Sequence, residues 1–178
     1  MALFMHGGFA PDTWYRLDAS EELPTDGQIL MSLDDWHRRA PLRSHAHATL
    51  SPATLSNVAF GVMLDPDDAV EEILPDLQHF ALVAIAFPKF TDGRGYSQAG
   101  LIRGRHGFKG QLRAVGDVLF DQLQLMARCG FDAFEINDAA TIRLLESGRR
   151  PDLHHFYQPG IGRERPVGTR PWTRQPEV

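Results

Sequence analysis

The segment FPKFTDGRGYS, residues 87–97, carries most of the side chains that could bind a charged ligand. It directly follows an apolar run, residues 80–87. Lys89 and Arg94 supply positive charge, and a helix starting near Tyr96 would aim its free N–H groups at the same place, which favours an anion. The sequence therefore predicts a loop that binds a phosphate, a sulfate-like group or a carboxylate. The candidate ligand-binding residues of this loop are Lys89, Asp92, Gly93, Arg94, Gly95, Tyr96 and Ser97.

The same segment is also a good turn sequence. Asp92 could simply pair with Arg94 or cap the backbone, and Tyr96 could pack on the sheet. The segment has neither the glycine spacing and terminal Lys-Ser/Thr pair of a Walker loop nor the GxGxxG spacing of a dinucleotide site. Both interpretations, a ligand loop and a structural turn, stay open.

Further charged residues follow later in the chain. Asp117 and Asp121 lie four positions apart on a predicted helix and would share a face. Paired carboxylates can transfer protons, but they also occur in a first helical turn to suit the helix dipole. The candidate catalytic residues are Asp92 and Asp117. Outside the loop, the candidate ligand-binding residues are Arg103, Arg113 and Asp117.

The cysteine and the histidines predict no metal site. Cys129 is the only cysteine, so one chain supplies neither an internal disulfide nor a multi-cysteine cluster, and we expect a packed, unreactive thiol. The pairs His45/His47 and His154/His155 lack helical i, i+4 spacing and a nearby carboxylate cluster. No metal and no cofactor are predicted.

Strand and helix patterns alternate over most of the chain. Apolar runs predict a first strand at 28–33 and then strands at 60–64, 80–87, 112–116 and 131–136, with helices over about 65–77, 97–105, 117–130 and 138–147. Parallel strands need crossovers, and helices make good ones. We predict an α/β fold with a mainly parallel sheet of about five strands, either open or closing partly like a βα-barrel.

The two ends of the chain are expected to differ from this pattern. Residues 1–10 suggest a loose terminus, and residues 14–17 a short N-terminal strand or hairpin. Residues 158–178 are rich in proline, glycine and arginine, which predicts a disordered tail. We predict a single domain over residues 1–157.

Composition excludes several classes of protein. The 178 residues carry a net charge of -5, so nucleic acid is not an expected partner. No segment approaches the roughly 18 apolar residues that span a bilayer. Together with the single cysteine, this predicts a cytoplasmic protein.

Three motifs in order, FPKFTDGRGYS, GQLRAVGDVLFDQL and RCGFDAF, carry a family resemblance over about residues 14–136. The chain resembles a bacterial family defined by a domain of unknown function. Its members are typically encoded beside assimilatory sulfite reductase, and some are labelled oxidoreductases. The resemblance implies a role in sulfur assimilation, with sulfite reductase or another sulfate-assimilation enzyme as partner. Matching positions are Phe87, Pro88, Phe90, Asp92, Gly93, Arg94, Tyr96, Ser97, Arg103, Arg113, Gly116, Asp117, Asp121, Gln122, Cys129, Gly130 and Phe131.

Two positions depart from the family pattern. Gly100 stands where relatives usually carry arginine, and Gly104 where they carry an acid.

Three functional hypotheses are compatible with the sequence. The first is an accessory protein of sulfite reduction that binds a partner enzyme or an anionic metabolite. The second is a small enzyme acting on an anionic sulfur metabolite, and the third is a module that forms a homodimer through the loop.

Overall fold

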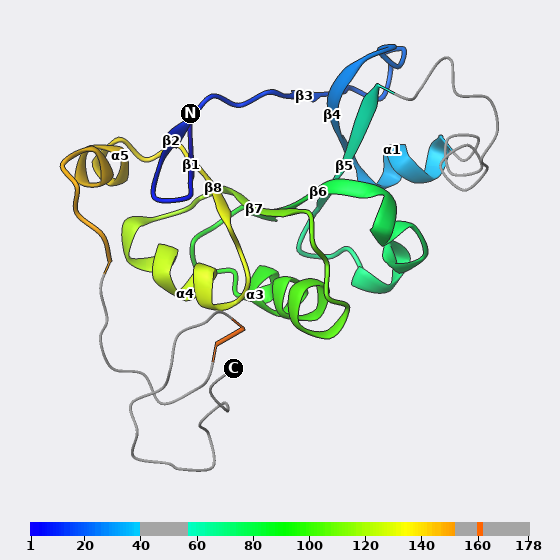
Figure 1. Ribbon diagram of the computed structural model, residues 1–178. Coiled ribbons are helices and arrows are strands. Elements are labelled where there is room, and N and C mark those ends of the chain that lie inside the picture. Colours follow the sequence, from blue (N-terminus) through cyan, green and yellow to red (C-terminus); the bar gives the residue numbers. More distant parts are fainter. Residues whose placement is uncertain (40–56, 152–159, 162–178) are drawn as a thin grey trace.

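The chain folds around one mixed sheet of eight strands in the order β2-β1-β8-β7-β6-β5-β4-β3 (Figure 1). The structure is a computed structural model that describes residues 1–39, 57–151 and 160–161. The strands are β1 (Ala2–Met5), β2 (Gly8–Ala10), β3 (Trp14–Arg16), β4 (Gly27–Ser32), β5 (Val58–Leu64), β6 (Phe80–Phe87), β7 (Gln111–Gly116) and β8 (Ala133–Ile136).

The prediction of a mainly parallel α/β sheet is confirmed in its coarse form, but about five strands was too few. The run from β3 to β8 is parallel, whereas β1 pairs antiparallel with both β8 and β2. Residues 1–10 are thus a paired hairpin and not a loose terminus. Its two-residue turn has positive φ at His6 (51°) and Gly7 (81°), as a tight hairpin turn requires.

The sheet curls into a half-barrel. In a flat sheet with strands about 4.8 Å apart, β3 and β8 would lie roughly 24 Å from each other. However, Arg16 of β3 donates a hydrogen bond to Glu135 of β8 at 2.5 Å. Strong curling brings the two strands together, which answers the question of open sheet or partial barrel in favour of partial closure.

Helices cover one face of the sheet. They are α1 (Leu33–Arg38), α3 (Arg94–Ala99), α4 (Leu123–Arg128) and α5 (Ala139–Glu146), together with the 3₁₀ helices η1 (Val70–Glu72), η2 (Leu74–His79) and η4 (Phe120–Gln122) and the π-helical segment η3 (Gly100–Arg105). Figure 1 shows α3 and α4 on the same side of the strands. Within the described residues, no helix is long and apolar enough to span a membrane.

The alternating side chains of β6 explain the two-sided packing. Val83, Ile85 and Phe87 belong to the main core beneath the helices. Leu82 and Ala84 belong to a smaller cluster on the inner side of the curl, against which Trp14 packs. Because both faces are covered, the strand reads as a continuous apolar run.

Two helices differ from their prediction. Residues 70–79 form η1 and η2 and not one α-helix, with Pro75 in the first turn of η2. The helix predicted from Asp117 begins only at Phe120, so Asp117 lies in the turn after β7 and does not share a helical face with Asp121. The predicted disordered tail lies outside the described residues, apart from Gly160 and Ile161.

Candidate functional site

The predicted loop connects the end of β6 to α3, and its two small residues have different surroundings. Gly95 is buried against the strand end: a Cβ there would lie 2.6 Å from the ring of Phe87. Tyr96 packs edge-on against the same ring, with centroids 5.3 Å apart, and burial raises the pKa of its hydroxyl. Gly93, by contrast, has open space around it. Gly95 and Tyr96 therefore hold α3 on the sheet.

Arg94 is paired within the protein. Its guanidinium binds Asp92 at 2.7 Å and also contacts Asp67 in the loop after β5. Hydrogen bonds from Arg94 lower the pKa of Asp92 to about 2. An anion would have to compete with two carboxylates for Arg94, and a carboxylate with so low a pKa is a weak general base at neutral pH.

Asp117 organises the loop after β6. Its carboxylate accepts a hydrogen bond from the Phe90 N–H at 2.9 Å, and its own N–H donates to the Phe87 carbonyl at 2.7 Å. The Gln122 side-chain amide donates to the Phe90 carbonyl at 2.8 Å. Both backbone polar groups of Phe90 are thus fixed by side chains that follow β7, while 53% of Phe90 is exposed.

Gly116 makes this arrangement possible. Its φ is +103°, and a Cβ at this position would lie 2.4 Å from the Phe87 carbonyl oxygen. Only glycine allows the end of β7 to approach the end of β6 this closely. The close approach is what brings Asp117 within hydrogen-bonding distance of Phe90.

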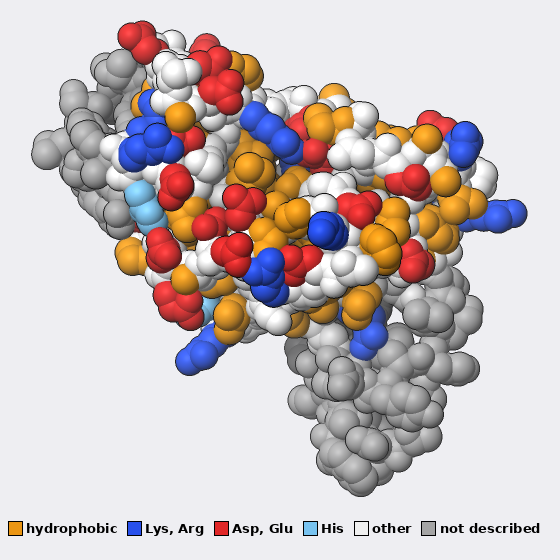
Figure 2. All heavy atoms as spheres, turned by 180° about the vertical axis from the view of Figure 1, so that it is seen from behind, with side chains coloured by type: hydrophobic (Ala, Val, Ile, Leu, Met, Phe, Trp, Pro, Cys, Tyr) orange, Lys and Arg blue, Asp and Glu red, His pale blue; other side chains and the backbone are white. Residues whose placement is uncertain are grey.

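The strand ends around Arg94 carry more negative than positive charge. Burial, followed by repulsion from Asp68, Asp67 and Asp34, raises the pKa of Asp65. The segments 65–68, 89–94 and 117–121 contain six aspartates, one lysine and one arginine. Figure 2 shows one face of the molecule, on which acidic, basic and hydrophobic side chains are interspersed.

Arg103 lies elsewhere. It donates to the Gly130 carbonyl at 3.1 Å and pairs with Asp132 at 2.6 Å, and it also reaches the Phe108 carbonyl. These partners precede β7 and β8, whereas the loop of Phe90 lies beyond the carboxyl ends of the strands. The structure therefore does not bring Arg103 to the predicted loop.

Arg113 is likewise separate from the loop. It lies in β7 with only 1% of its surface exposed. Its guanidinium pairs with Asp12 at 2.8 Å and with Gln111 at 2.9 Å. Lys89 and Ser97, by contrast, are exposed at the loop. Among the predicted residues, the segment 89–97 and Asp117 come together, while Arg103 and Arg113 have structural partners of their own.

A family model described as "Bacterial protein of unknown function (DUF934)" matches residues 61–168. The chain belongs to the DUF934 family. The matched part starts inside β5, so it includes the loop after β6, Asp117 and Gln122 but not the hairpin or Arg16. Comparisons with curated proteins and with solved structures found no match.

Several residues that shape this DUF934 site were not picked out as site residues from the sequence. Asp67 binds Arg94, and the Gln98 amide donates to the carbonyls of Asp65 and Asp68, each at 2.9 Å. Gln122 matches the family signature, which was the one signal for its role. For Asp67 and Gln98, no sequence pattern predicts contacts made about 30 residues away.

Metal binding finds no support in the part of the chain that the structure describes, since no cluster of His, Cys, Asp or Glu there is placed to hold an ion. His45, His47, His154 and His155 lie outside the described residues. Cys129, at the end of α4, is half-buried, and burial raises the pKa of its thiol.

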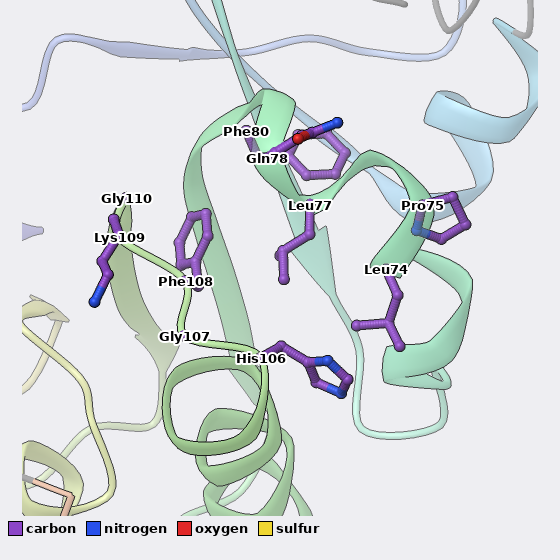
Figure 3. Close-up of a pocket in the computed structure, with 10 residues that line it drawn as sticks. All are labelled: Leu74, Pro75, Leu77, Gln78, Phe80, His106, Gly107, Phe108, Lys109 and Gly110. Atoms are coloured by element: carbon purple, nitrogen blue, oxygen red, sulfur yellow. The ribbon is translucent and has the colours of Figure 1, made fainter.

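A cavity that the sequence did not predict lies at the opposite, amino-terminal ends of β6 and β7 (Figure 3). Its volume is about 530 Å³, and it lies between η2 and the turn at 106–110 that precedes β7. All of it falls within the part matched by the DUF934 family. In the sequence, residues 106–110 form the run HGFKG, which indicates the end of a helix followed by a turn and gives no sign of a cavity.

Proposed function

We propose that this DUF934 protein is an accessory protein of assimilatory sulfate and sulfite reduction that binds a partner enzyme through the loop around Phe90. The link to sulfur metabolism rests on the family resemblance. The choice of a partner enzyme over a free anion rests on one observation: Phe90 is 53% exposed, while side chains fix its backbone N–H and C=O.

An exposed aromatic side chain on an ordered backbone is well suited to protein recognition. Aromatic residues, phenylalanine included, are enriched in protein interfaces, where they bury a large apolar area. Holding the backbone in place before binding reduces the entropy lost on association. Phe90 meets both conditions, since Asp117 and Gln122 order its loop in the free protein.

The charges around Phe90 indicate the chemistry of the partner surface. Asp67 has 89% of its side chain exposed, and Asp121 is also exposed. Lys89 is exposed as well, and Arg94 is paired with Asp67 and Asp92, so this surface carries more carboxylates than cations. A fitting partner has an apolar pocket for the phenyl ring, bordered by lysine or arginine side chains.

The test is direct binding to the sulfite reductase encoded in the same genome, measured by biolayer interferometry. Phe90→Ala should weaken the complex by about 30-fold, as expected for a residue worth about 2 kcal/mol. Leu125→Ala is the matched control, because Leu125 is also exposed (49%) but lies on α4. This control should change the affinity by less than about 3-fold.

A second variant, Arg94→Ala, tests the anion-binding alternative. Wild-type protein is screened by thermal unfolding against sulfite, sulfate and phosphate, and Arg94→Ala is screened in parallel. If sulfite reductase does not bind the wild type, or binds Phe90→Ala as tightly as the wild type, the proposal is wrong. Stabilisation of the wild type by an anion, lost in Arg94→Ala, would support the anion-binding alternative instead.

A further inference from the structure

We infer that the cavity between η2 and the turn before β7 binds a small molecule with a flat apolar body and one anionic group. This site lies at the end of the sheet opposite the Phe90 loop, so it does not depend on the proposed partner. Its volume of about 530 Å³ falls within the roughly 300–1,000 Å³ of small-molecule sites.

Half of the residues that line the cavity are apolar. Leu74 and Leu77 come from η2, Phe80 starts β6, and Phe108 stands in the turn before β7. In Figure 3, Leu77 and Leu74 extend from η2 into the space that faces Phe108 and His106. Two leucines and two aromatic rings form a lining suited to a flat aromatic body.

The turn that forms one wall is held in place before any ligand binds. The Phe108 N–H donates to the Ile102 carbonyl at 3.1 Å, and the guanidinium of Arg103 lies 5.6 Å from the centroid of the Phe108 ring. Gly110 lets the turn run against β6, because a Cβ there would lie 2.7 Å from the Ala81 carbonyl oxygen. The wall is therefore preformed, which lowers the cost of binding.

The polar side chains of the lining indicate an anionic group on the ligand. The residues that line the cavity include His106, Lys109 and Gln78 but no carboxylate, although the whole chain carries 23 acidic and 18 basic residues. Figure 3 shows the His106 ring beneath Leu77, whereas Lys109 extends away from the cavity. His106 would therefore donate a hydrogen bond to the anionic group, with Lys109 adding positive charge nearby. A carboxylate, a sulfonate or a phosphate would serve equally.

Two fluorescent probes test this site. Anilinonaphthalene sulfonate has a flat apolar body and one anionic group, and phenylnaphthylamine has the same body without the charge. Both probes should bind the wild type at a single saturable site. Anilinonaphthalene sulfonate should bind at least about 10-fold more tightly, as expected for one hydrogen bond to a charged group. Binding that does not saturate would overturn the inference.

Three variants connect the probes to the residues. Leu74→Trp, at a half-buried wall position, should fill the cavity and weaken both probes about 10-fold. His106→Ala should weaken the anionic probe alone. Leu125→Trp adds the same bulk on α4 and should change neither. Circular dichroism confirms that each variant is folded, and Leu77→Phe replaces Leu74→Trp if that variant is not.

Each variant can also contradict the inference. If the filled variant binds both probes as the wild type does, the cavity is not the site. If His106→Ala weakens both probes equally, the assignment of an anionic group to His106 is wrong. Neither result bears on the binding of sulfite reductase, which is measured with Phe90→Ala.

Discussion

Replacing Gly116 by alanine should destabilise the fold by about 1.5–3.5 kcal/mol. The glycine has φ +103°, and alanine pays roughly 1–2 kcal/mol to adopt a left-handed conformation. Its Cβ would also lie 2.4 Å from the Phe87 carbonyl oxygen, which must then move. That movement breaks the 2.7 Å hydrogen bond from the Asp117 N–H, which contributes about 0.5–1.5 kcal/mol.

Two other glycines separate backbone strain from the steric clash. Gly107 has φ +65°, but a Cβ at this position would have no neighbour within 4 Å, so Gly107→Ala should cost only about 1–2 kcal/mol. Gly93 has φ -86° and open surroundings, so Gly93→Ala should stay within about 0.5 kcal/mol of the wild type. Comparing the three variants separates the destabilisation of Gly116→Ala into backbone strain and steric clash.

Thermal unfolding of the three variants provides the measurement. For a chain of this size, each kcal/mol lowers Tm by about 2–4 °C, so Gly116→Ala should melt about 3–14 °C below the wild type. Urea unfolding at constant m value gives the free energies directly. If Gly116→Ala costs no more than Gly107→Ala, the contact between the ends of β6 and β7 is not as close as described.

Three further outcomes follow from the charges and the thiol. Because Arg94 lowers the pKa of Asp92 to about 2, the pair's stabilisation should persist above the ordinary value of 3.8 and disappear as pH falls through about 2. In Arg94→Ala, a carboxyl NMR titration should find the pKa of Asp92 raised toward 3.8, although the N–H of residue 94 still donates to the carboxylate. An unchanged pKa would contradict the pairing. The pKa of Asp65 is raised, so its charge opposes folding at neutral pH. Asp65→Asn should therefore raise the free energy of unfolding at pH 7, measured in urea, by up to about 0.5 kcal/mol. The gain should be smaller near pH 4. Cys129 should react with iodoacetamide at least about 10-fold more slowly in the native protein than in urea, because burial raises the pKa of its thiol. Equal reaction rates, measured by mass spectrometry, would show that the thiolate is accessible in the native protein.

Local patterns were sufficient for the central part of the fold. The apolar runs at 60–64, 80–87 and 112–116 predicted β5, β6 and β7 to within two residues at each end. A strand buried on both faces needs such a run, so its signal is contained in adjacent residues. The position of the loop after β6 followed from the same pattern, because a polar, glycine-rich segment directly succeeds the strand.

The hairpin and the curl of the sheet had no comparable local signal. β1 gains its place by pairing with β8, more than 100 residues later in the chain. The curl brings Arg16 to Glu135. A second ion pair, between Arg113 and Asp12, also joins residues about 100 positions apart. Contacts between such distant residues depend on how the whole sheet closes, which no periodicity within a short window records.

The sequence by itself determined which residues gather in the loop at the end of β6, and that two of them are glycines. Only the tertiary structure decided what they do: Gly95 packs under Phe87, Arg94 is paired with two aspartates, and Asp117 holds Phe90. The physical reason is that charge and hydrogen-bonding capacity belong to a residue type, whereas the partner that satisfies them is set by the approach of other segments. Here that approach is the close contact between the ends of β6 and β7.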